Sequence, residues 1–134
     1  MTRPDIAGIV FDVDGCVARG KQALPGVPET LATLRARGIR CAFVTNENMS
    51  TRAQVVDKLN GMGIPTGAED VVTSAIVAAE VTRALHPGKK VLAVGAAGLI
   101  EALQLAGMTL VDAGNAAEAE VVVMGKDPNF NMKM

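Results

Sequence analysis

Two acidic side chains stand one residue apart in the stretch GIVFDVDG, residues 8 to 15. Asp12 and Asp14 follow a run of apolar residues that predicts a buried strand, and Gly15 lets the chain leave that strand. Two carboxylates this close repel each other unless a cation lies between them, and a hard divalent ion such as Mg²⁺ takes oxygen ligands. One carboxylate could then act as a nucleophile and the other as a proton donor or acceptor. From DxDG alone, an exposed turn with two solvated aspartates is equally compatible.

A second apolar run meets polar residues abruptly in CAFVTNENMSTR, residues 41 to 52. Thr45 and Asn46 stand between a predicted strand and a predicted helix. The Thr45 hydroxyl, the Asn46 amide and nearby backbone N–H groups are donors that suit a tetrahedral anion. Taken alone, a Thr-Asn pair before a helix is more often a capping arrangement.

The elements that must position these residues alternate between short apolar runs and segments of helical period. This alternation predicts βαβ units, a mostly parallel sheet and therefore an α/β fold. Ligands bind at the carboxyl ends of such strands, where Asp12 and Thr45 are expected. Strands are predicted at Ile9–Val13, Arg40–Thr45, Val71–Thr73, Lys90–Gly95, Thr109–Val111 and Glu120–Met124.

Four helices are predicted between these strands, and glycines mark the ends of several of them. The second helix is expected to begin after Ser50 or Thr51 and to face inward with Ala53, Val56, Leu59 and Met62. The other three are predicted at Val27–Arg37, Ala75–Leu85 and Gly98–Ala106.

Composition narrows the class of protein. The 134 residues are 49% hydrophobic and 20% charged, which is typical of one ordinary globular domain. The net charge of −1 and the lack of a basic run argue against a nucleic-acid partner. No apolar stretch reaches the roughly 18 residues that span a bilayer, and two cysteines without metal-ligand spacing read as reduced thiols. A cytoplasmic location without a membrane contact is therefore expected.

The order of the two motifs, a strand ending in DxDG and a strand ending in TN about 33 residues later, resembles the haloacid-dehalogenase-like (HAD) superfamily. The chain is most similar to the subclass with a large α/β cap, which includes p-nitrophenyl phosphatases, phosphoglycolate phosphatases and NagD-type nucleotidases. The stretches LPGVPETLATLRARGIRCAFVTN, STRAQVVDKLNGMGI, VVTSAIVAAEVTRAL, VLAVGAAGLIEALQLAGMTLV and VVVMGKDPNF carry the resemblance nearly end to end.

This resemblance implies a Rossmann-like core with a parallel sheet and Mg²⁺-dependent hydrolysis of phosphate monoesters through an aspartyl-phosphate. Asp12 matches the family nucleophile and a metal ligand, and Asp14 matches the general acid/base, which also reaches the metal. Thr45 and Asn46 match the phosphate-binding motif, and residues 15 to 24 match a mobile segment that helps to close the site. The implied substrate is a small phosphorylated metabolite, and homo-oligomerisation stays open.

The chain departs from the family pattern in two respects. Glu47 stands where many relatives have a second Asn, which puts the role of this position in doubt. The family completes its site with a lysine and a GDxxxTD motif, and neither is present in this sequence; Lys126 and Asp127 match a cap turn and are not substitutes. We therefore expect the first half of the core at residues 1–78 and the beginning of a truncated cap at 79–134.

A second hypothesis follows from this incompleteness. The chain could be a non-catalytic α/β module, either a truncated product or a phosphate-binding or interaction domain. Unfinished sheet edges and faces would then need a partner. A phosphatase assay with and without the Asp12 carboxylate separates the two hypotheses.

Overall fold

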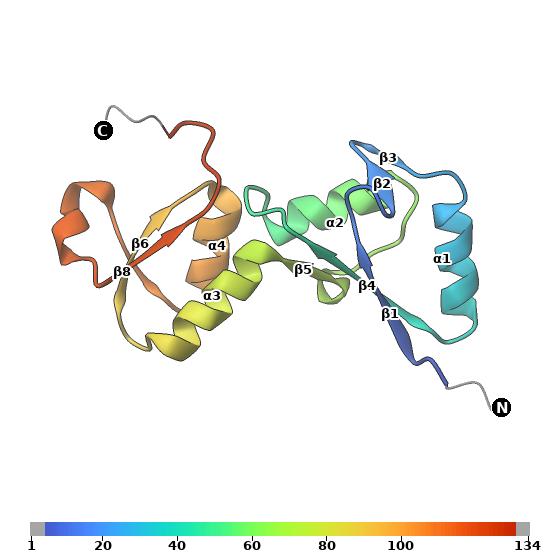
Figure 1. The fold of residues 1–134 in the computed structure, drawn as a ribbon, viewed down its shortest axis with the longest axis horizontal. Coiled ribbons are helices and arrows are strands. Elements are labelled where there is room, and N and C mark those ends of the chain that lie inside the picture. The colour runs from blue at the N-terminus through green and yellow to red at the C-terminus, as the bar shows by residue number, and fades with distance from the viewer. Residues whose placement is uncertain (1–4, 131–134) are drawn as a thin grey trace. The chain divides into compact units, whose positions relative to one another are not determined.

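The computed structural model describes residues 5–130, in which strands and helices alternate along the chain (Figure 1). By its internal contacts the chain divides into two compact units. The first unit comprises Met1–Thr45 and Arg52–Val72, and the second comprises Asn46–Thr51 and Thr73–Met134. The short segment after the strand that ends at Thr45 therefore packs with the second unit, although the chain on either side of it belongs to the first.

The first unit is built on a three-stranded sheet in the order β1-β4-β5, with β1 parallel to β4. A two-stranded antiparallel hairpin, β2–β3, follows β1. The elements are β1 (Gly8–Asp12), β2 (Ala18–Arg19), β3 (Gln22–Ala23), α1 (Val27–Ala36), β4 (Arg40–Thr45), α2 (Arg52–Gly61), a 3₁₀ turn η1 (Ala68–Asp70) and β5 (Val71–Thr73).

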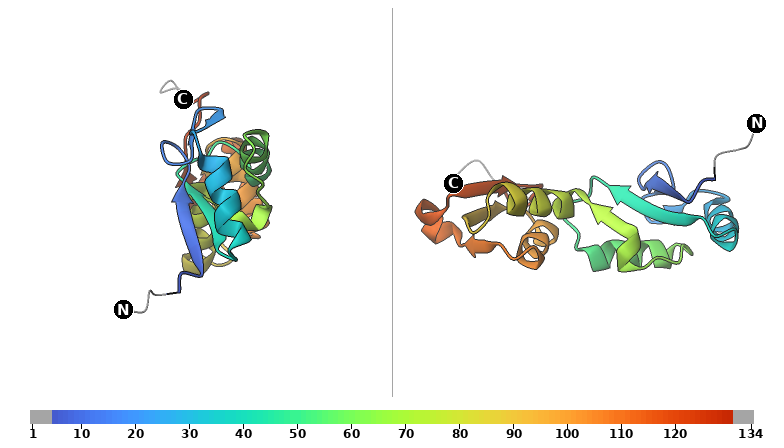
Figure 2. Two further views of the ribbon diagram at one scale, coloured as in Figure 1. Left: turned by 90° about the vertical axis from the view of Figure 1, so that its right-hand side faces the viewer. Right: turned by 90° about the horizontal axis from the view of Figure 1, so that it is seen from below.

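Both helices of the first unit pack on one face of this sheet, as Figure 2 shows for α1 and α2 beside β1 and β4. Cys41 and Phe43 of β4 are buried under Leu31 of α1 and Leu59 of α2. The opposite face carries Val10, which is 67% exposed, and Val44, which is 41% exposed. Because both faces of a parallel sheet are normally covered by other elements, the exposure of these two valines is unusual.

The second unit has a parallel sheet in the order β7-β6-β8. Helices α3 and α4 pack on each other and on one face of it, around Ala79, Leu99 and Leu103. The elements are α3 (Ser74–Leu85), β6 (Lys90–Val94), α4 (Ala97–Leu105), β7 (Thr109–Val111), a 3₁₀ segment η2 (Ala113–Glu118) and β8 (Val121–Met124).

The segment Asn46–Thr51 is held against α4. The Gly98 N–H donates to the carbonyl oxygen of Met49 at 2.8 Å. A Cβ atom at Gly98 would collide with the Ser50 carbonyl oxygen and would lie 2.9 Å from that of Asn48. The glycine is therefore required by the close approach of two backbones.

The α/β prediction is confirmed, and the strands Arg40–Thr45, Val71–Thr73 and Thr109–Val111 have their predicted bounds. The β2–β3 hairpin was not predicted, because each of its strands has only two residues and no periodicity. The predicted inner face of α2 is wrong at Ala53, which is exposed, while Val55 is buried in its place.

The division into core and cap, at residues 78 and 79, stays a prediction. Within residues 5–130, no helix is long and apolar enough to cross a membrane.

We predict that Gly98→Ala destabilises the second unit by about 1–3 kcal/mol, because the added methyl group displaces the backbone at Ser50. Chemical denaturation followed by NMR signals of the second unit measures this change. Gly114→Ala is the matched control, since a Cβ atom there has nothing within 4 Å. Equal stability of the two variants would contradict the proposed close packing.

A second prediction concerns the stability of the fold at low pH. Hydrogen bonds from the Lys90 and Lys89 amines lower the pKa of Glu118 and of Glu120, respectively, below the ordinary value of 4.5. Because the folded pKa values lie below the unfolded ones, the stabilisation is present above pH 4.5 and is lost as the pH falls through the lowered pKa values. We expect the melting temperature of the Glu118→Gln/Glu120→Gln variant to change less between pH 6 and pH 3 than that of the unaltered chain. A Glu101→Gln variant should keep the full dependence; the same dependence in all three proteins would refute the assignment.

Candidate active site

Asp12 is the last residue of β1 and lies opposite Val44 in the parallel register with β4. Because parallel strands run in the same direction, the ends of β1 and β4 meet at the same edge of the sheet. Asp12 is exposed and lies on the same face as Val10 and Val44. The carboxylate therefore stands at the end of the uncovered, apolar face, where a ligand has access to it.

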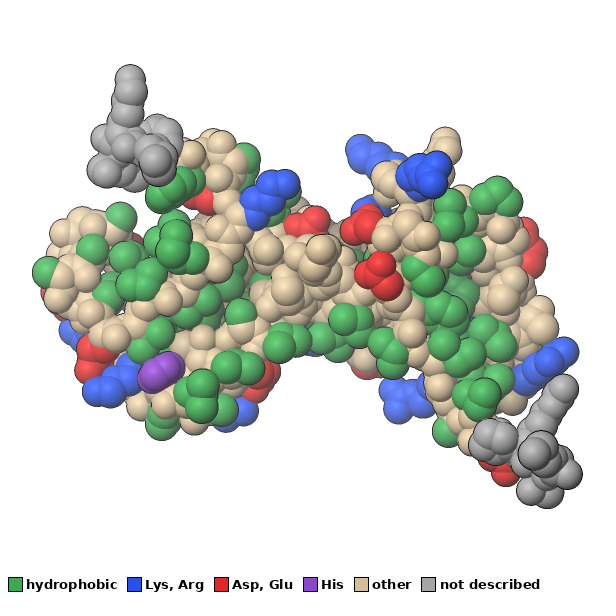
Figure 3. Space-filling model, viewed as in Figure 1, with side chains coloured by type: hydrophobic (Ala, Val, Ile, Leu, Met, Phe, Trp, Pro, Cys, Tyr) green, Lys and Arg blue, Asp and Glu red, His purple; other side chains and the backbone are tan. Residues whose placement is uncertain are grey.

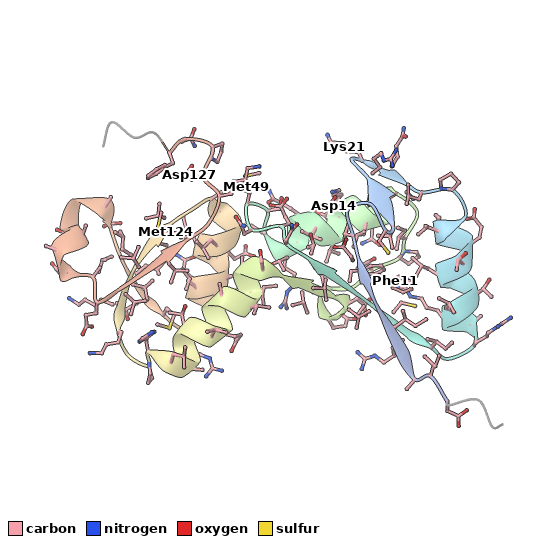
Figure 4. All side chains as sticks on the ribbon, viewed as in Figure 1. Phe11, Asp14, Lys21, Met49, Met124 and Asp127 are labelled. Atoms are coloured by element: carbon pink, nitrogen blue, oxygen red, sulfur yellow. The ribbon has the colours of Figure 1, made fainter. Side chains whose placement is uncertain are left out.

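A tight turn carries the second carboxylate directly after β1. The Val13 carbonyl oxygen accepts the N–H groups of Val17 and Ala18, each at 3.0 Å, and the Gly15 N–H donates to the Ala18 carbonyl at 2.8 Å. Gly15 has φ +84°, a conformation that side chains disfavour, so the predicted departure of the chain occurs at this glycine. Asp14 lies at the base of the hairpin that bears Lys21 at its turn (Figure 4).

Lys58 of α2 is the cation next to this turn, and the sequence did not single it out. Its Nζ lies 3.7 Å from Oδ1 of Asp14, and the two side chains are 36% and 57% exposed. Such a half-exposed pair contributes at most about 1 kcal/mol to stability. Its interest is electrostatic, because it places one positive charge beside the Asp14 carboxylate. A lone lysine on an amphipathic helix gives no sequence signal for this contact.

Thr45 ends β4, and its side chain continues the buried row of Cys41 and Phe43, with 4% of the residue exposed. Asp12 lies on the opposite, exposed face of the same sheet. The structure thus brings Asp12 and Thr45 to one edge of the sheet, with their side chains on alternate faces. The assignment of the Thr45 hydroxyl as an anion donor stays a prediction.

Asn46 is exposed and belongs to the second unit. The Ser74 hydroxyl at the start of α3 donates to the carbonyl oxygen of Asn46 at 2.9 Å and is 3.2 Å from that of Glu47. A serine at the start of a helix reads as a cap in the sequence, so this role for Ser74 was missed. Asn46 is thereby tied through its backbone to α3.

The Glu47 carboxylate accepts hydrogen bonds from the backbone of its own loop. Its Oε1 accepts the backbone N–H groups of Met49 at 2.6 Å and Ser50 at 3.2 Å. The Asn48 side chain accepts the Lys126 N–H at 2.8 Å in the same unit. An acid at position 47 therefore has a structural role, which the sequence left in doubt.

The carboxylates of Asp12 and Asp14 suit a hard divalent cation that takes most of its ligands from water and substrate. No group of three or more His, Cys, Asp or Glu side chains that could hold a metal ion occurs among residues 5–130. Asp12 and Asp14 offer two carboxylates, and Mg²⁺ is typically bound by one or two carboxylates, several waters and substrate phosphate oxygens. These two residues fit such a shared site and do not form a closed protein cage.

Comparisons with known proteins bear on this geometry. A family model described as haloacid dehalogenase-like hydrolase matches residues 9–109. The sugar-phosphatase AraL of Bacillus subtilis is 36% identical over 118 residues, which cover 88% of this chain and 43% of that protein. The glycerol-3-phosphate phosphatase of Mus musculus is 34% identical over 151 residues, covering 95% of this chain and 47% of that protein.

Solved structures agree with these relatives. A glycerol phosphate phosphatase from Mycobacterium tuberculosis in complex with magnesium superposes with a TM-score of 0.85 at 31% identity, covering 94% of this chain and 38% of that one. A p-nitrophenyl phosphatase from Archaeoglobus fulgidus gives 0.84 at 30% identity, covering 96% and 48%. The chain thus spans less than half the length of these relatives. On the family match and these relatives together, the chain belongs to the haloacid dehalogenase-like hydrolases.

Proposed function

We propose that this chain supplies the nucleophile and the general acid/base of a Mg²⁺-dependent phosphatase that hydrolyses small phosphate monoesters. The single observation that carries the proposal is the pair Asp12 and Asp14 at the end of β1, in a chain whose relatives are named as phosphatases. The proposed roles of Thr45 and Asn46 are to hold the phosphoryl oxygens. A cytoplasmic location and homo-oligomerisation, expected from the sequence, stay predictions.

The proposed reaction has two steps. A carboxylate oxygen of Asp12 attacks phosphorus, the bond from phosphorus to the ester oxygen breaks, and Asp14 gives its proton to the leaving alkoxide. Water then attacks the aspartyl-phosphate, Asp14 takes the proton from that water, and inorganic phosphate leaves with the Asp12 carboxylate restored. When bound by Asp12 and Asp14, Mg²⁺ supplies charge neutralisation for the phosphoryl oxygens.

Lys58 bears on the proposed role of Asp14 as the general acid/base. Its ammonium group lies 3.7 Å from the Asp14 carboxylate in the absence of substrate. A positive charge at that distance limits where the Asp14 side chain rests. We propose that Lys58 positions Asp14 between turnovers.

The alternative is a non-catalytic module that binds another protein through the uncovered face of the first sheet. The observation in its favour is the exposure of Val10 and Val44 on that face. This alternative predicts that removing the Asp12 carboxylate changes neither the hydrolysis of phosphate esters nor the binding of phosphoryl analogues.

The test uses beryllium fluoride, which mimics a phosphoryl group on an aspartate. With Mg²⁺ present, ¹⁹F NMR should show protein-bound fluoride for the unaltered chain and none for Asp12→Asn, because the amide cannot coordinate beryllium as the carboxylate does. Hydrolysis of p-nitrophenyl phosphate, where detectable, should fall at least 100-fold in the same variant.

Asp112→Asn is the control, since Asp112 is an exposed carboxylate in the second unit. It should bind fluoride as the unaltered chain does. The same ¹⁹F spectrum for the unaltered chain and Asp12→Asn, with or without bound fluoride, would contradict the proposed nucleophile and favour the non-catalytic module.

A further inference from the structure

Helix α3 of the second unit carries most of its larger apolar side chains on the side that faces away from its own sheet. Its fully buried positions hold small residues, Ala75, Ala79 and Thr82. Of its four larger apolar side chains, only that of Ile76 packs against the core. The other three are exposed: Val77 by 49%, Val81 by 50% and Leu85 by 69%. A surface helix normally turns its larger apolar residues toward the core, so this arrangement is unusual.

The exposed side chains form one continuous stripe along the helix. Val77, Val81 and Leu85 are four residues apart, and each step of four moves about 40° round a helix. Val81 is therefore at the middle of the stripe. Ala84 lies on nearly the same side of the helix as Val77, and Ala78 on nearly the same side as Leu85, because residues seven apart almost coincide in direction. We call these five residues, 77, 78, 81, 84 and 85, the α3 stripe; Figure 3 shows hydrophobic side chains along the course of this helix.

The charges of α3 lie away from the stripe and neutralise each other. Glu80 and Arg83 are the two charged residues of this helix. Nη2 of Arg83 donates to Oε2 of Glu80 at 2.8 Å, and Nε donates to the same oxygen at 3.1 Å. Round the helix, Glu80 and Arg83 are about 100° and 160° from Val81. A surface that covers the α3 stripe therefore buries no unpaired charge.

The α3 stripe is complementary to itself in the antiparallel direction. If two copies of α3 run in opposite directions about a two-fold axis at Val81, this valine faces Val81 of the second copy. On one side of the axis Val77 then meets Ala84 of the second copy, and on the other side Leu85 meets Ala78 of the second copy. Each outer contact thus joins a larger side chain to a small one, which lets facing helices interdigitate.

We propose that the α3 stripe is the contact surface of a symmetric dimer, and that its partner is a second copy of this chain. A two-fold contact uses the same patch on both copies, and the α3 stripe meets that requirement. Two helices of this length bury less than the roughly 1,200 Å² of a standard stable interface, so the dimer forms and dissociates readily. The inference does not depend on the proposed function, because no residue of the stripe belongs to the candidate active site.

The test is sedimentation velocity of the 134-residue chain over a range of concentrations. Between about 5 and 500 µM, the range suited to a small interface, the sedimentation coefficient should rise toward that of a dimer. Val81→Glu should weaken the dimer at least tenfold, because the two-fold axis places two like charges opposite each other.

A mixing experiment separates this contact from a loss of folding. Val81→Lys should weaken the dimer as Val81→Glu does, for the same reason. An equimolar mixture of the two variants should associate again, because each glutamate then faces a lysine. Far-UV circular dichroism of each variant alone should match that of the unaltered chain.

Val122→Glu is the matched control. Val122 is a 55% exposed valine of β8, in the same unit as α3 and outside the stripe. This variant should dimerise as the unaltered chain does.

Each remaining outcome overturns the proposal. A chain that stays monomeric up to about 500 µM has no such dimer. A dimer that withstands Val81→Glu, or that Val122→Glu weakens as strongly, associates through another surface. Weakening by both Val81 variants without association of their mixture contradicts the two-fold pairing at Val81.

Discussion

The parallel pairing of β1 with β4 is the constraint on which the candidate site depends. It aligns Asp12 with Val44, so the two strands end together and their polar termini lie at one edge. An edge of this kind brings together residues far apart in the sequence without any direct bond between them. The tight turn after β1 then carries Asp14 two residues beyond Asp12, and the divalent cation that we propose would relieve repulsion between the two carboxylates.

The polar segment after β4 is divided between the two units of the chain. Thr45 is packed into the first unit, whereas the loop from Asn46 onward is held by Ser74 of α3 and Gly98 of α4. The Asn48 side chain of this loop also accepts the N–H of Lys126. The backbone of Asn46 is thus positioned by residues almost 30 positions later in the chain.

Much of the fold was predictable because apolar strands and glycine-ended helices leave strong local patterns. Strand β4 and the departure of the chain from the strand at Gly15 are examples. The contacts of Lys58 and Ser74 were not predictable, because each depends on tertiary packing and each residue has an ordinary local reading as a solvated lysine or a helix cap. The β2–β3 hairpin was not predicted for a related reason. Its two-residue strands are stabilised by their turn and by the buried Ala18, and strands this short leave no periodicity in the sequence.

The central claim is that Asp12 and Asp14 form one divalent-cation site at the end of β1. Paramagnetic broadening by Mn²⁺, a stand-in for Mg²⁺, tests it directly in ¹⁵N-labelled protein. At substoichiometric Mn²⁺ we expect the amide signals of residues 12–15 to broaden first, and this selectivity to disappear in an Asp12→Asn/Asp14→Asn variant. Broadening centred on other carboxylates, such as Glu118 and Glu120, or the same pattern in the variant, would contradict the claim.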